Sequence, residues 1–456
     1  MNPNAPAITS REAAVTHAGL ARLVEEATGR LRSRGVVAGD RVGLWSANSL
    51  DGIVIALAVE RAGAVLVPLN ARLADPEIEW QLGLARPKFV VASEELAARS
   101  VRGAPVHSFE AFDSVSPIDG GADETLADPT RDAVIVFTSG TTGRPKGAVL
   151  TRANRAAAAR AAAAVLPLGE GDRWLASLPF FHVGGLGLLS RAFASGACVH
   201  LPSSFSADDL AEAIADRGIT HASVVDATLA RILEAFGEKP LPSRVKALVV
   251  GGGPVSPALV EACPLALATY GLTESCAMAT LVRPGAPRSE RRTAGRLLPG
   301  IEARIAEDGI VELRGPTVMR GYLDDEAATS RVLVDGWLRT GDLGEIDAAG
   351  CLTILARRED LIVSGGENVY PAEIERVLKE HPRVVDAVVI GVPDERWGQA
   401  PLAFVQAPGV GEAELAAFVA MRLASYKRPR ISFVDDIPRL ASGKPDRAAL
   451  KKIGVR

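Results

Sequence analysis

Hydrophobic and polar positions follow two different periods along the first half of the chain. Apolar residues recur at helical spacing over residues 16–35, and residues 41–46 follow with a buried strand pattern. Residues 53–62 are predicted to form a helix that is apolar on nearly every side, and residues 64–69 form the next strand pattern. Similar apolar runs occur at residues 89–92, 133–137, 222–225 and 247–250. This repeated strand and helix pattern predicts a layered α/β architecture.

The pattern changes in the last third of the chain. After residue 300, short strands alternate with Gly-containing turns, as in a smaller β-rich subdomain. From residue 357 onward the chain has its own helix, two strands and a further helix, and about 100 residues is enough for a separate domain. We therefore expect a large N-terminal domain over residues 1–356 and a small α+β C-terminal domain over residues 357–456.

Composition is that of an ordinary globular protein with more than one core. The chain has 456 residues, of which 48% are hydrophobic and 23% are charged. A formal net charge of -4 is small for this length, so charge gives no reason to expect a nucleic acid or an anionic membrane as partner. Small-molecule chemistry is the remaining expectation.

The cysteines and the N-terminus indicate a protein of the cytoplasm. The four cysteines are widely spaced and form no CxxC pair, which argues against a disulfide framework and a zinc site. No apolar run approaches the roughly 20 residues of a membrane helix, and the N-terminus lacks a signal-peptide pattern. We expect no membrane insertion, and the sequence leaves open whether the chain forms a homo-oligomer.

The segment 137–147 concentrates hydroxyls, glycines and one lysine directly after a strand pattern. Backbone N–H groups and hydroxyls of such a loop can turn toward an anion, and a lysine adds a point charge. The spacing is not that of a Walker A loop, and the alternative is an ordinary surface turn. The candidate phosphate-binding residues are Thr138, Ser139, Gly140, Thr141, Thr142 and Lys146.

This loop resembles the signature loop of the adenylate-forming superfamily, which comprises acyl-CoA synthetases, adenylation domains and luciferases. The superfamily's aromatic-Gly-hydrophobic-Thr-Glu motif has a counterpart in Tyr270-Gly271-Leu-Thr273-Glu274. The resemblance implies that Tyr270 stacks on adenine, Thr273 contacts the α-phosphate and Glu274 holds Mg²⁺, roles that suit an aromatic face and a hard carboxylate. Taken alone, the motif could equally open a helix with a threonine cap. Upstream, the turn of Gly251, Gly252 and Gly253 resembles the superfamily's turn beneath the base.

Three further motifs follow in the order that the resemblance predicts. Asp342 ends a Gly-Trp-Leu-Arg-Thr-Gly-Asp motif and is expected to accept hydrogen bonds from both ribose hydroxyls. Arg357 is expected to contact the nucleotide, with Glu359 as the hinge of a mobile C-terminal domain. Lys444 resembles the lysine that enters the site during adenylation, although a lone lysine near a terminus is usually solvated. The turn of Ser364, Gly365 and Gly366 is expected to line the path of coenzyme A.

The acyl pocket is expected around residues 178–191. His182 and Gly185 lie in this apolar stretch, and the resemblance places His182 at the acyl site, although a histidine among apolar residues is often part of the core. Arg191 is the unusual cation of the stretch. It resembles a feature of the o-succinylbenzoate-CoA ligases of menaquinone synthesis, whose acid carries two carboxylates. The other interpretation of Arg191 is a surface residue or a structural ion pair.

Together these motifs predict an enzyme that activates a carboxylic acid as an acyl-adenylate. We expect an AMP-forming acid-thiol ligase with ATP and coenzyme A as co-substrates and Mg²⁺ as cofactor. The expected catalytic residues are His182, Thr273, Glu274 and Lys444. Two alternatives stay open: a CoA ligase for another aromatic, branched or medium-chain acid, and a stand-alone adenylation enzyme that loads a carrier protein.

Overall fold

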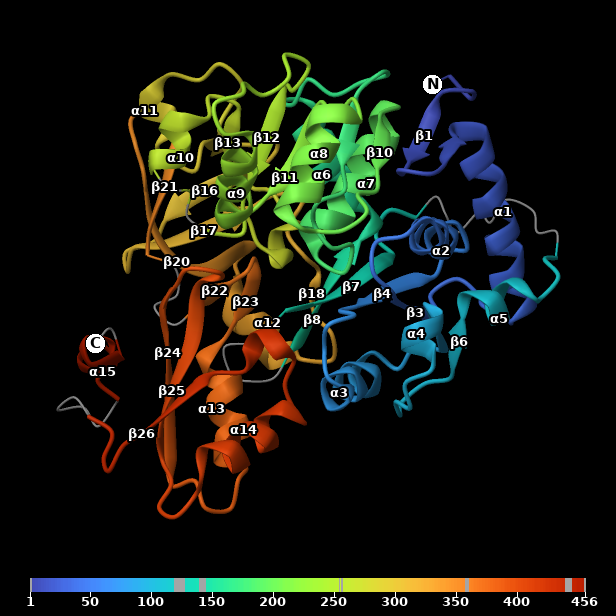
Figure 1. Ribbon diagram of the computed structural model, residues 1–456. Coiled ribbons are helices and arrows are strands. Elements are labelled where there is room, and N and C mark those ends of the chain that lie inside the picture. The colour runs from blue at the N-terminus through green and yellow to red at the C-terminus, as the bar shows by residue number, and fades with distance from the viewer. Residues whose placement is uncertain are drawn as a thin grey trace. The chain divides into compact units, whose positions relative to one another are not determined.

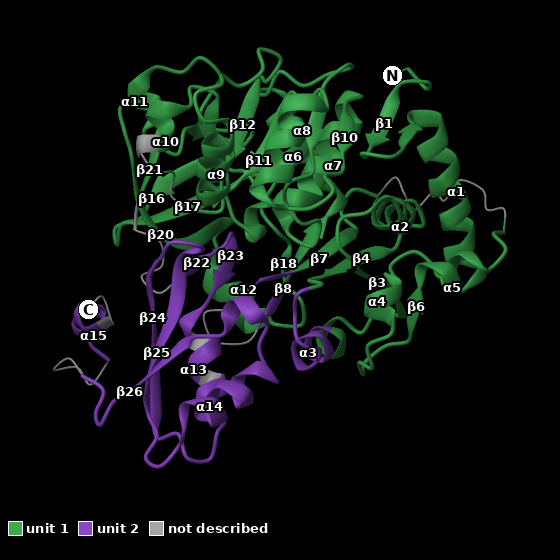
Figure 2. Cartoon of the chain, in the orientation of Figure 1, with its two compact units in different colours: residues 1–71, 82–136, 147–355 green, residues 72–81, 137–146, 356–456 purple. Residues whose placement is uncertain are grey.

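The computed structural model describes residues 2–118, 128–138, 145–253, 255, 257–356, 361–438 and 445–454. The chain divides into two compact units, which are coloured separately in Figure 2. Unit 1 comprises residues 1–71, 82–136 and 147–355, and unit 2 comprises residues 72–81, 137–146 and 356–456. Figure 1 labels the helices and strands along the chain.

The first sheet of unit 1 has seven strands. They are Pro6–Thr9 (β1), Ala14–Thr16 (β2), Arg173–Leu175 (β9), Cys198–His200 (β10), His221–Val224 (β11), Ala247–Val250 (β12) and Ala266–Ala268 (β13). Their order in the sheet is β13-β12-β11-β9-β10-β1-β2. All neighbours are parallel except β1 and β2, which are antiparallel. Strands β11, β12 and β13 are fully buried, as expected for short apolar runs inside a parallel sheet.

The second sheet of unit 1 also has seven strands. They are Arg41–Trp45 (β3), Val65–Leu69 (β4), Phe89–Ala92 (β5), Val106–Ser108 (β6), Asp132–Thr138 (β7), Lys146–Thr151 (β8) and Gly321–Tyr322 (β18). Their order is β18-β8-β7-β4-β3-β5-β6. The pairs of β3 with β4 and β5, of β4 with β7 and of β5 with β6 are parallel, whereas β18 lies antiparallel to β8. The predicted α/β class is confirmed by these two sheets and their helices.

Helices connect the parallel strands, and polar residues define where they begin. The helices of unit 1 are His17–Ser33 (α1), Leu50–Arg61 (α2), Glu94–Ala97 (α4), Phe109–Asp113 (α5), Arg152–Ala163 (α6), Val183–Ser195 (α7), Ala207–Asp216 (α8), Asp226–Phe236 (α9), Pro257–Ala262 (α10), Arg288–Arg291 (α11) and Glu326–Val332 (α12). Thr16 and Ser49 cap α1 and α2 by accepting a hydrogen bond from the backbone N–H three residues later. One hydrophobic core includes side chains from both sheets and from α1, α2, α6 and α7. The two sheets therefore belong to a single packed body.

The predicted β-rich subdomain is present between residues 280 and 356. Its five-stranded sheet consists of Glu302–Ile305 (β16), Ile310–Arg314 (β17), Leu333–Val334 (β19), Trp337–Ile346 (β20) and Leu352–Ala356 (β21). The pairs β16–β17, β17–β20 and β19–β20 are antiparallel. A separate antiparallel pair is formed by Thr280–Leu281 (β14) and Arg296–Leu297 (β15). The long strand β20 carries the motif that contains Asp342.

Unit 2 is an α+β body built around a second set of strands. The strands are Ile362–Ser364 (β22), Glu367–Val369 (β23), Asp386–Asp394 (β24), Gly398–Gln406 (β25) and Arg430–Phe433 (β26), and the helices are Pro371–Lys379 (α13), Glu412–Ala420 (α14) and Arg447–Gly454 (α15). A core of its own lies between β24, β25, α13 and α14. The unit thus has the hydrophobic interior that an independent domain needs.

A buried lysine ties residues 72–81 to the rest of unit 2. The helix Asp75–Ala85 (α3) begins in this segment. Lys427 Nζ lies 2.7 Å from Oε1 of Glu77 and 2.9 Å from Oε1 of Glu373, and all three side chains are buried. Burial alone would lower the pKa of Lys427, but the charge of Glu373, aided by Glu77, raises this pKa overall.

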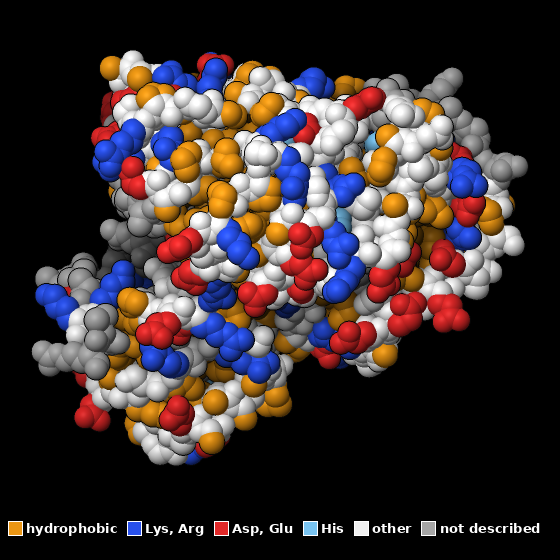
Figure 3. Space-filling view, turned by 45° about the horizontal axis from the view of Figure 1, so that its top comes forward, with side chains coloured by type: hydrophobic (Ala, Val, Ile, Leu, Met, Phe, Trp, Pro, Cys, Tyr) orange, Lys and Arg blue, Asp and Glu red, His pale blue; other side chains and the backbone are white. Residues whose placement is uncertain are grey.

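Among the described residues, every helix is too short or too polar to span a bilayer. Figure 3 shows lysine and arginine side chains interspersed with aspartate and glutamate over the displayed face.

Candidate nucleotide and acyl site

The predicted site residues of unit 1 gather where parallel strands of the first sheet end. After β12 the chain continues into Gly251, and Tyr270 comes two residues after β13. His182 follows β9 by seven residues and directly precedes α7. Strands β9, β11, β12 and β13 are neighbours and run in the same direction. Their carboxyl ends therefore meet at one edge, which is where ligands bind in open α/β sheets.

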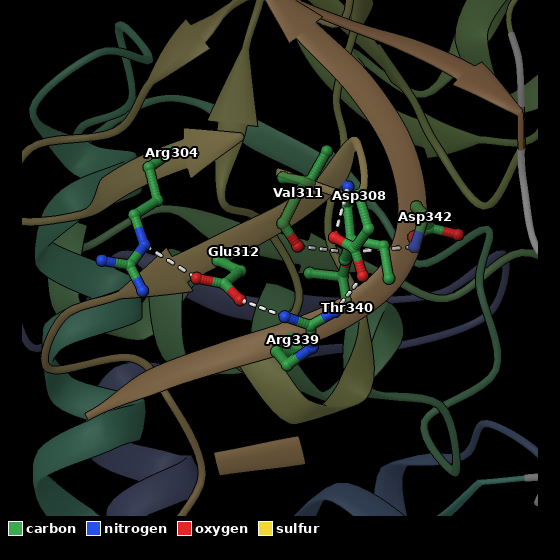
Figure 4. A network of polar contacts seen from close by, with 8 residues as sticks. Arg304, Asp308, Val311, Glu312, Arg339, Thr340 and Asp342 are labelled. Carbon is green, nitrogen blue, oxygen red and sulfur yellow. Dashed lines mark hydrogen bonds and ion pairs between the residues drawn. The ribbon is translucent and has the colours of Figure 1, made fainter. Parts of the chain in front are cut away.

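Tyr270 and Asp342 are 72 residues apart but in direct contact. The Tyr270 hydroxyl donates a hydrogen bond of 2.7 Å to Oδ2 of Asp342, and both residues are buried. The backbone N–H of Asp342 donates to Thr340 Oγ1 at 3.1 Å, and the Thr340 hydroxyl donates to the carbonyl of Val311 at 2.8 Å (Figure 4). The predicted base-stacking ring and the predicted ribose acceptor are thus adjacent, as base and ribose are in a nucleoside.

An ion-pair network fixes the strand that carries Asp342. Glu312 on β17 accepts from Arg304 Nε at 2.7 Å and from Arg339 Nη1 at 2.8 Å, so its buried carboxylate joins β16, β17 and β20 (Figure 4). Arg339 also donates to Asp308 at 2.5 Å. Because β20 is held on its neighbours through Arg339, the backbone on either side of Thr340 has little freedom to shift.

The turn after Tyr270 depends on a close backbone approach. A Cβ atom on Gly271 would lie 1.5 Å from the carbonyl oxygen of Ala277, so only glycine fits. The 3-10 helix Thr273–Ser275 (η2) follows, and then Cys276 and Ala277 adopt left-handed φ angles of 58° and 84°. Two successive non-glycine residues in this region mark stored backbone strain, which commonly accompanies functional sites.

Glu274 is buried and held by one neighbouring segment. Its side chain accepts a hydrogen bond of 2.6 Å at Oε1 from the Tyr322 hydroxyl, and its backbone carbonyl accepts one of 2.8 Å from the N–H of Met319. Among the described residues, Oε2 of Glu274 has no hydrogen-bond partner. A carboxylate oxygen in this state suits Mg²⁺, a hard cation that takes one or two protein carboxylates and completes its shell with phosphates. The described part of the chain contains no group of three or more His, Cys, Asp or Glu side chains that could hold a metal ion.

The glycine turn that was predicted to lie beneath the base is next to the Tyr270 turn. A Cβ atom on Gly251 would come within 2.8 Å of the Thr269 methyl group, and Gly252 has a left-handed φ of 79°. These constraints explain two of the three glycines. The lysine of the predicted phosphate loop, Lys146, begins β8, and Thr138 ends β7; both residues lie in the segment 137–146 of unit 2.

The predicted acyl residues lie at the start of α7 and along it. His182 is the N-cap of α7, and its ring contacts Phe181 edge to face with 4.8 Å between centroids. Gly185 has a packing role, because a Cβ atom there would lie 2.1 Å from the carbonyl oxygen of Pro179. Helix α7 can therefore approach the end of β9 closely.

Arg191 projects from α7 into a buried space. Only 4% of the residue is exposed, and its buried Nε has no hydrogen-bond partner in the part of the chain that the structure describes. The guanidinium lies over the Trp174 ring, 5.0 Å from its centroid, and Nη1 would be 3.1 Å from a Cβ on Gly187. Burial lowers the pKa of Arg191 to about 10, and burial raises the pKa of the neighbouring Cys276 thiol to about 11. No carboxylate among the described residues pairs with this cation, so the alternative interpretation of Arg191 as a surface residue or a structural ion pair is not supported.

Several predicted residues cannot be placed with this group. Seven of the predictions lie outside the described residues: Ser139, Gly140, Thr141, Thr142, Arg357, Glu359 and Lys444. Ser364, Gly365 and Gly366 belong to unit 2, where they form the turn between β22 and β23. Gly365 and Gly366 have left-handed φ angles of 56° and 83°, and a Cβ on Gly365 would lie 2.5 Å from the Trp397 ring.

Sequence reasoning missed three residues that support the site. Tyr322 contacts Glu274, Thr340 supports Asp342, and Trp174 lies beneath Arg191. Thr340 stands two residues from Asp342 inside the same motif, so the alternation of a strand could have identified it. Tyr322 and Trp174 carry no local signal, because their partners are distant in the sequence.

Comparison with known proteins identifies the family. Residues 1–323 match the family described as AMP-binding enzyme, and residues 373–444 match the AMP-binding enzyme C-terminal domain. The chain is 37% identical over 470 residues to a 2-succinylbenzoate–CoA ligase of Bacillus cereus (strain AH820), covering 99% of this chain and 96% of that protein.

Two solved structures of o-succinylbenzoate CoA synthetase from Bacillus subtilis are also similar. One is a double mutant bound to the product analogue OSB-NCoA, with a TM-score of 0.92, and the other holds the acyl-adenylate intermediate OSB-AMP, with a TM-score of 0.74. Each is 32% identical to this chain, and each match covers 99% of this chain and 96% of the other. The resemblance inferred from the motifs is therefore confirmed, and the chain belongs to the AMP-binding enzyme family.

Proposed function

We propose that this chain joins o-succinylbenzoate to coenzyme A. It is an ATP-dependent, AMP-forming acid-thiol ligase. In the first step a carboxylate oxygen of the acid attacks the α-phosphorus of ATP, the bond to the bridging oxygen breaks, and pyrophosphate leaves. In the second step the sulfur of coenzyme A attacks the acyl carbon of the adenylate, the thiol proton is lost, and AMP leaves.

In this proposal, different residues of unit 1 bind different parts of ATP during the first step. Tyr270 stacks on adenine, Asp342 accepts from the ribose hydroxyls, and Thr273 contacts the α-phosphate. Glu274 would hold Mg²⁺, which when bound screens the charge of the phosphate oxygens. The buried position of Glu274 and its second oxygen, which has no partner among the described residues, support this assignment. Lys146 and Lys444 keep the phosphate and adenylation roles that the family resemblance implies.

The choice of acid rests on Arg191. A buried guanidinium without an ionic partner is costly in a folded protein, because its lost hydration is not replaced. The Cys276 thiol does not compensate for it, since a pKa of about 11 leaves this thiol neutral at pH 7. A second carboxylate on the substrate would supply the missing charge and can accept two parallel hydrogen bonds from a guanidinium. An acid with two carboxylates, such as o-succinylbenzoate, therefore fits better than a mono-acid.

The test replaces Arg191 and compares acids. Arg191→Met keeps much of the side-chain volume and removes the charge. We expect kcat/KM for o-succinylbenzoate to fall by at least about 100-fold, the size of a lost charge-assisted bidentate contact. Activity toward an analogue that lacks the second carboxylate should stay within a fewfold of the wild type. Acid-dependent pyrophosphate release measures both.

Arg191→Lys serves as the matched control. It keeps the charge but not the planar fork, so an intermediate loss is expected. Equal losses on the di-acid and the mono-acid in Arg191→Met would contradict a role in substrate choice. A wild-type protein that activates mono-acids as well as o-succinylbenzoate would contradict the proposed substrate, while leaving the ligase reaction intact.

A further inference from the structure

The first and last residues of the segment 319–322 each donate a hydrogen bond to Glu274. The Met319 N–H donates to the Glu274 carbonyl at 2.8 Å, and the Tyr322 hydroxyl donates to Oε1 of its carboxylate at 2.6 Å. Tyr322 provides the one hydrogen bond to this carboxylate among the described residues. Since only 6% of Glu274 is exposed, water offers little replacement.

The same segment is paired with β8. Tyr322 is the register partner of Ala148, and Gly321 is the partner of Val149. The N–H of Arg320 donates to Val149 O at 3.0 Å, and the N–H of Leu323 donates to Gly147 O at 2.7 Å. Strand β18 thus contacts β8 through its backbone and Glu274 through the Tyr322 side chain.

The backbone of Tyr322 is itself fixed. Its N–H donates to Thr329 Oγ1 at 2.9 Å, and the Thr329 hydroxyl donates to the Asp325 carbonyl at 2.8 Å. Gly321 has a φ of 154°, and a Cβ there would lie 2.8 Å from the Thr329 methyl group. These contacts restrict the backbone at Tyr322 and therefore the position of its ring. The Tyr322 hydroxyl can then hold the Glu274 carboxylate in one orientation.

We propose that Tyr322 is a positioning residue for the adenylation step, which orients the carboxylate of Glu274 so that Oε2 would be available to a bound Mg²⁺ ion. This inference rests on the proposed function. A carboxylate with no directional partner on Oε1 would rotate about its last torsion and present either oxygen. The hydrogen bond from Tyr322 selects one orientation, and the pairing of Tyr322 with Ala148 on β8 fixes the backbone from which the tyrosine extends.

The test measures metal-dependent binding without turnover. Tyr322→Phe removes only the hydroxyl. Calorimetry with a non-cleavable α,β-methylene analogue of ATP, with and without Mg²⁺, gives the gain in affinity that the metal provides. We expect this gain to fall by about tenfold in Tyr322→Phe, as for one hydrogen bond to a charged group. Binding of AMP without metal should not change.

Kinetics give a second readout of the same variant. Pyrophosphate release should lose kcat and require more Mg²⁺, whereas thioester formation from a supplied acyl-adenylate should keep its wild-type rate. Glu274→Gln should abolish the metal-dependent gain, and the double variant Tyr322→Phe/Glu274→Gln should bind like Glu274→Gln alone. An additive loss in the double variant would overturn the proposal, because Tyr322 would then act through another group.

Arg320→Ala is the matched control in the same segment. Its exposed side chain pairs with Asp132 at 3.1 Å and does not contact Glu274. This variant should keep the full metal-dependent gain. A loss there equal to that of Tyr322→Phe, or an unchanged gain in Tyr322→Phe, would overturn the positioning role. A wild-type protein that binds no nucleotide and releases no pyrophosphate with any acid would instead contradict the proposed function.

Discussion

Gly271 illustrates how a single missing methyl group determines the shape of the nucleotide turn. The carbonyl of Ala277 occupies the position where a Cβ would be, and the strained residues Cys276 and Ala277 depend on that approach. The chain passes directly from Tyr270 through this turn to Glu274. A change at Gly271 must therefore move the ring, the carboxylate or both.

Gly271→Ala should destabilise unit 1 by about 1–3 kcal/mol or more, as overpacking against backbone does, and should weaken AMP binding. Urea unfolding and AMP titration measure the two effects. Gly83→Ala is the control, because Gly83 lies in α3 with no atom within 4 Å of an added Cβ. That variant should gain roughly 0.5–1 kcal/mol. Normal AMP affinity in Gly271→Ala would contradict the close approach.

At the scale of elements, the start of α6 is connected to the distant segment that contains Pro316 and Val318. Thr151 Oγ1 accepts from the Asn154 N–H at 3.1 Å, and Asn154 Oδ1 accepts from the Thr151 N–H at 2.8 Å, which forms a capping box. The Asn154 side-chain amide also donates to the carbonyls of Pro316 and Val318, each at 2.8 Å. Asn154 therefore links the helix to the segment that leads into β18.

Thr151→Ala should cost about 1 kcal/mol, the usual loss of an N-cap. Asn154→Ala should cost more, roughly 2–4 kcal/mol, because it removes the hydrogen bonds to the Pro316 and Val318 carbonyls as well as the one from the Thr151 N–H. Equilibrium unfolding of the two variants measures the difference. Equal losses would mean that the contacts to Pro316 and Val318 contribute nothing to stability. If the link also orients β18, Asn154→Ala should reduce the metal-dependent gain in affinity, and Thr151→Ala should not.

At the scale of the whole molecule, buried histidines make stability depend on pH. Burial, aided by the positive charges of Arg173 and Arg217, lowers the pKa of His200 to about 4, and burial likewise lowers the pKa of His221 to about 4. Both values lie below the ordinary 6.5. Between pH 6.5 and 4 the unfolded chain therefore binds protons that the folded chain does not.

These neutral histidines contribute fully to the free energy of unfolding above about pH 6.5. The contribution is lost as the pH falls toward 4, by up to about 1.4 kcal/mol per pH unit for each residue. Urea midpoints followed by tryptophan fluorescence between pH 7.5 and 5 should show the decline. The slope should be smaller in His200→Gln than in the wild type. An unchanged slope would mean that His200 is protonated equally in both states.

The sequence by itself determined the succession of elements and the family. Short apolar runs such as residues 89–92 and 247–250 coincide with β5 and β12, because a buried strand needs local hydrophobicity and little else. Capping residues such as Thr16 likewise act within one turn of the helix. The nucleotide motifs could be identified because their chemistry is concentrated in a few consecutive residues.

Only the tertiary structure decided which of these residues meet. The contacts of Tyr270 with Asp342 and of Tyr322 with Glu274 join positions 72 and 48 residues apart, and no local pattern encodes such a pairing. The inclusion of residues 72–81 in unit 2 depends on Glu77 meeting Lys427. Whether Arg191 has a partner is a property of everything packed around it. Burial and long-range pairing arise from the folded chain as a whole, so periodicity and motifs could not supply them.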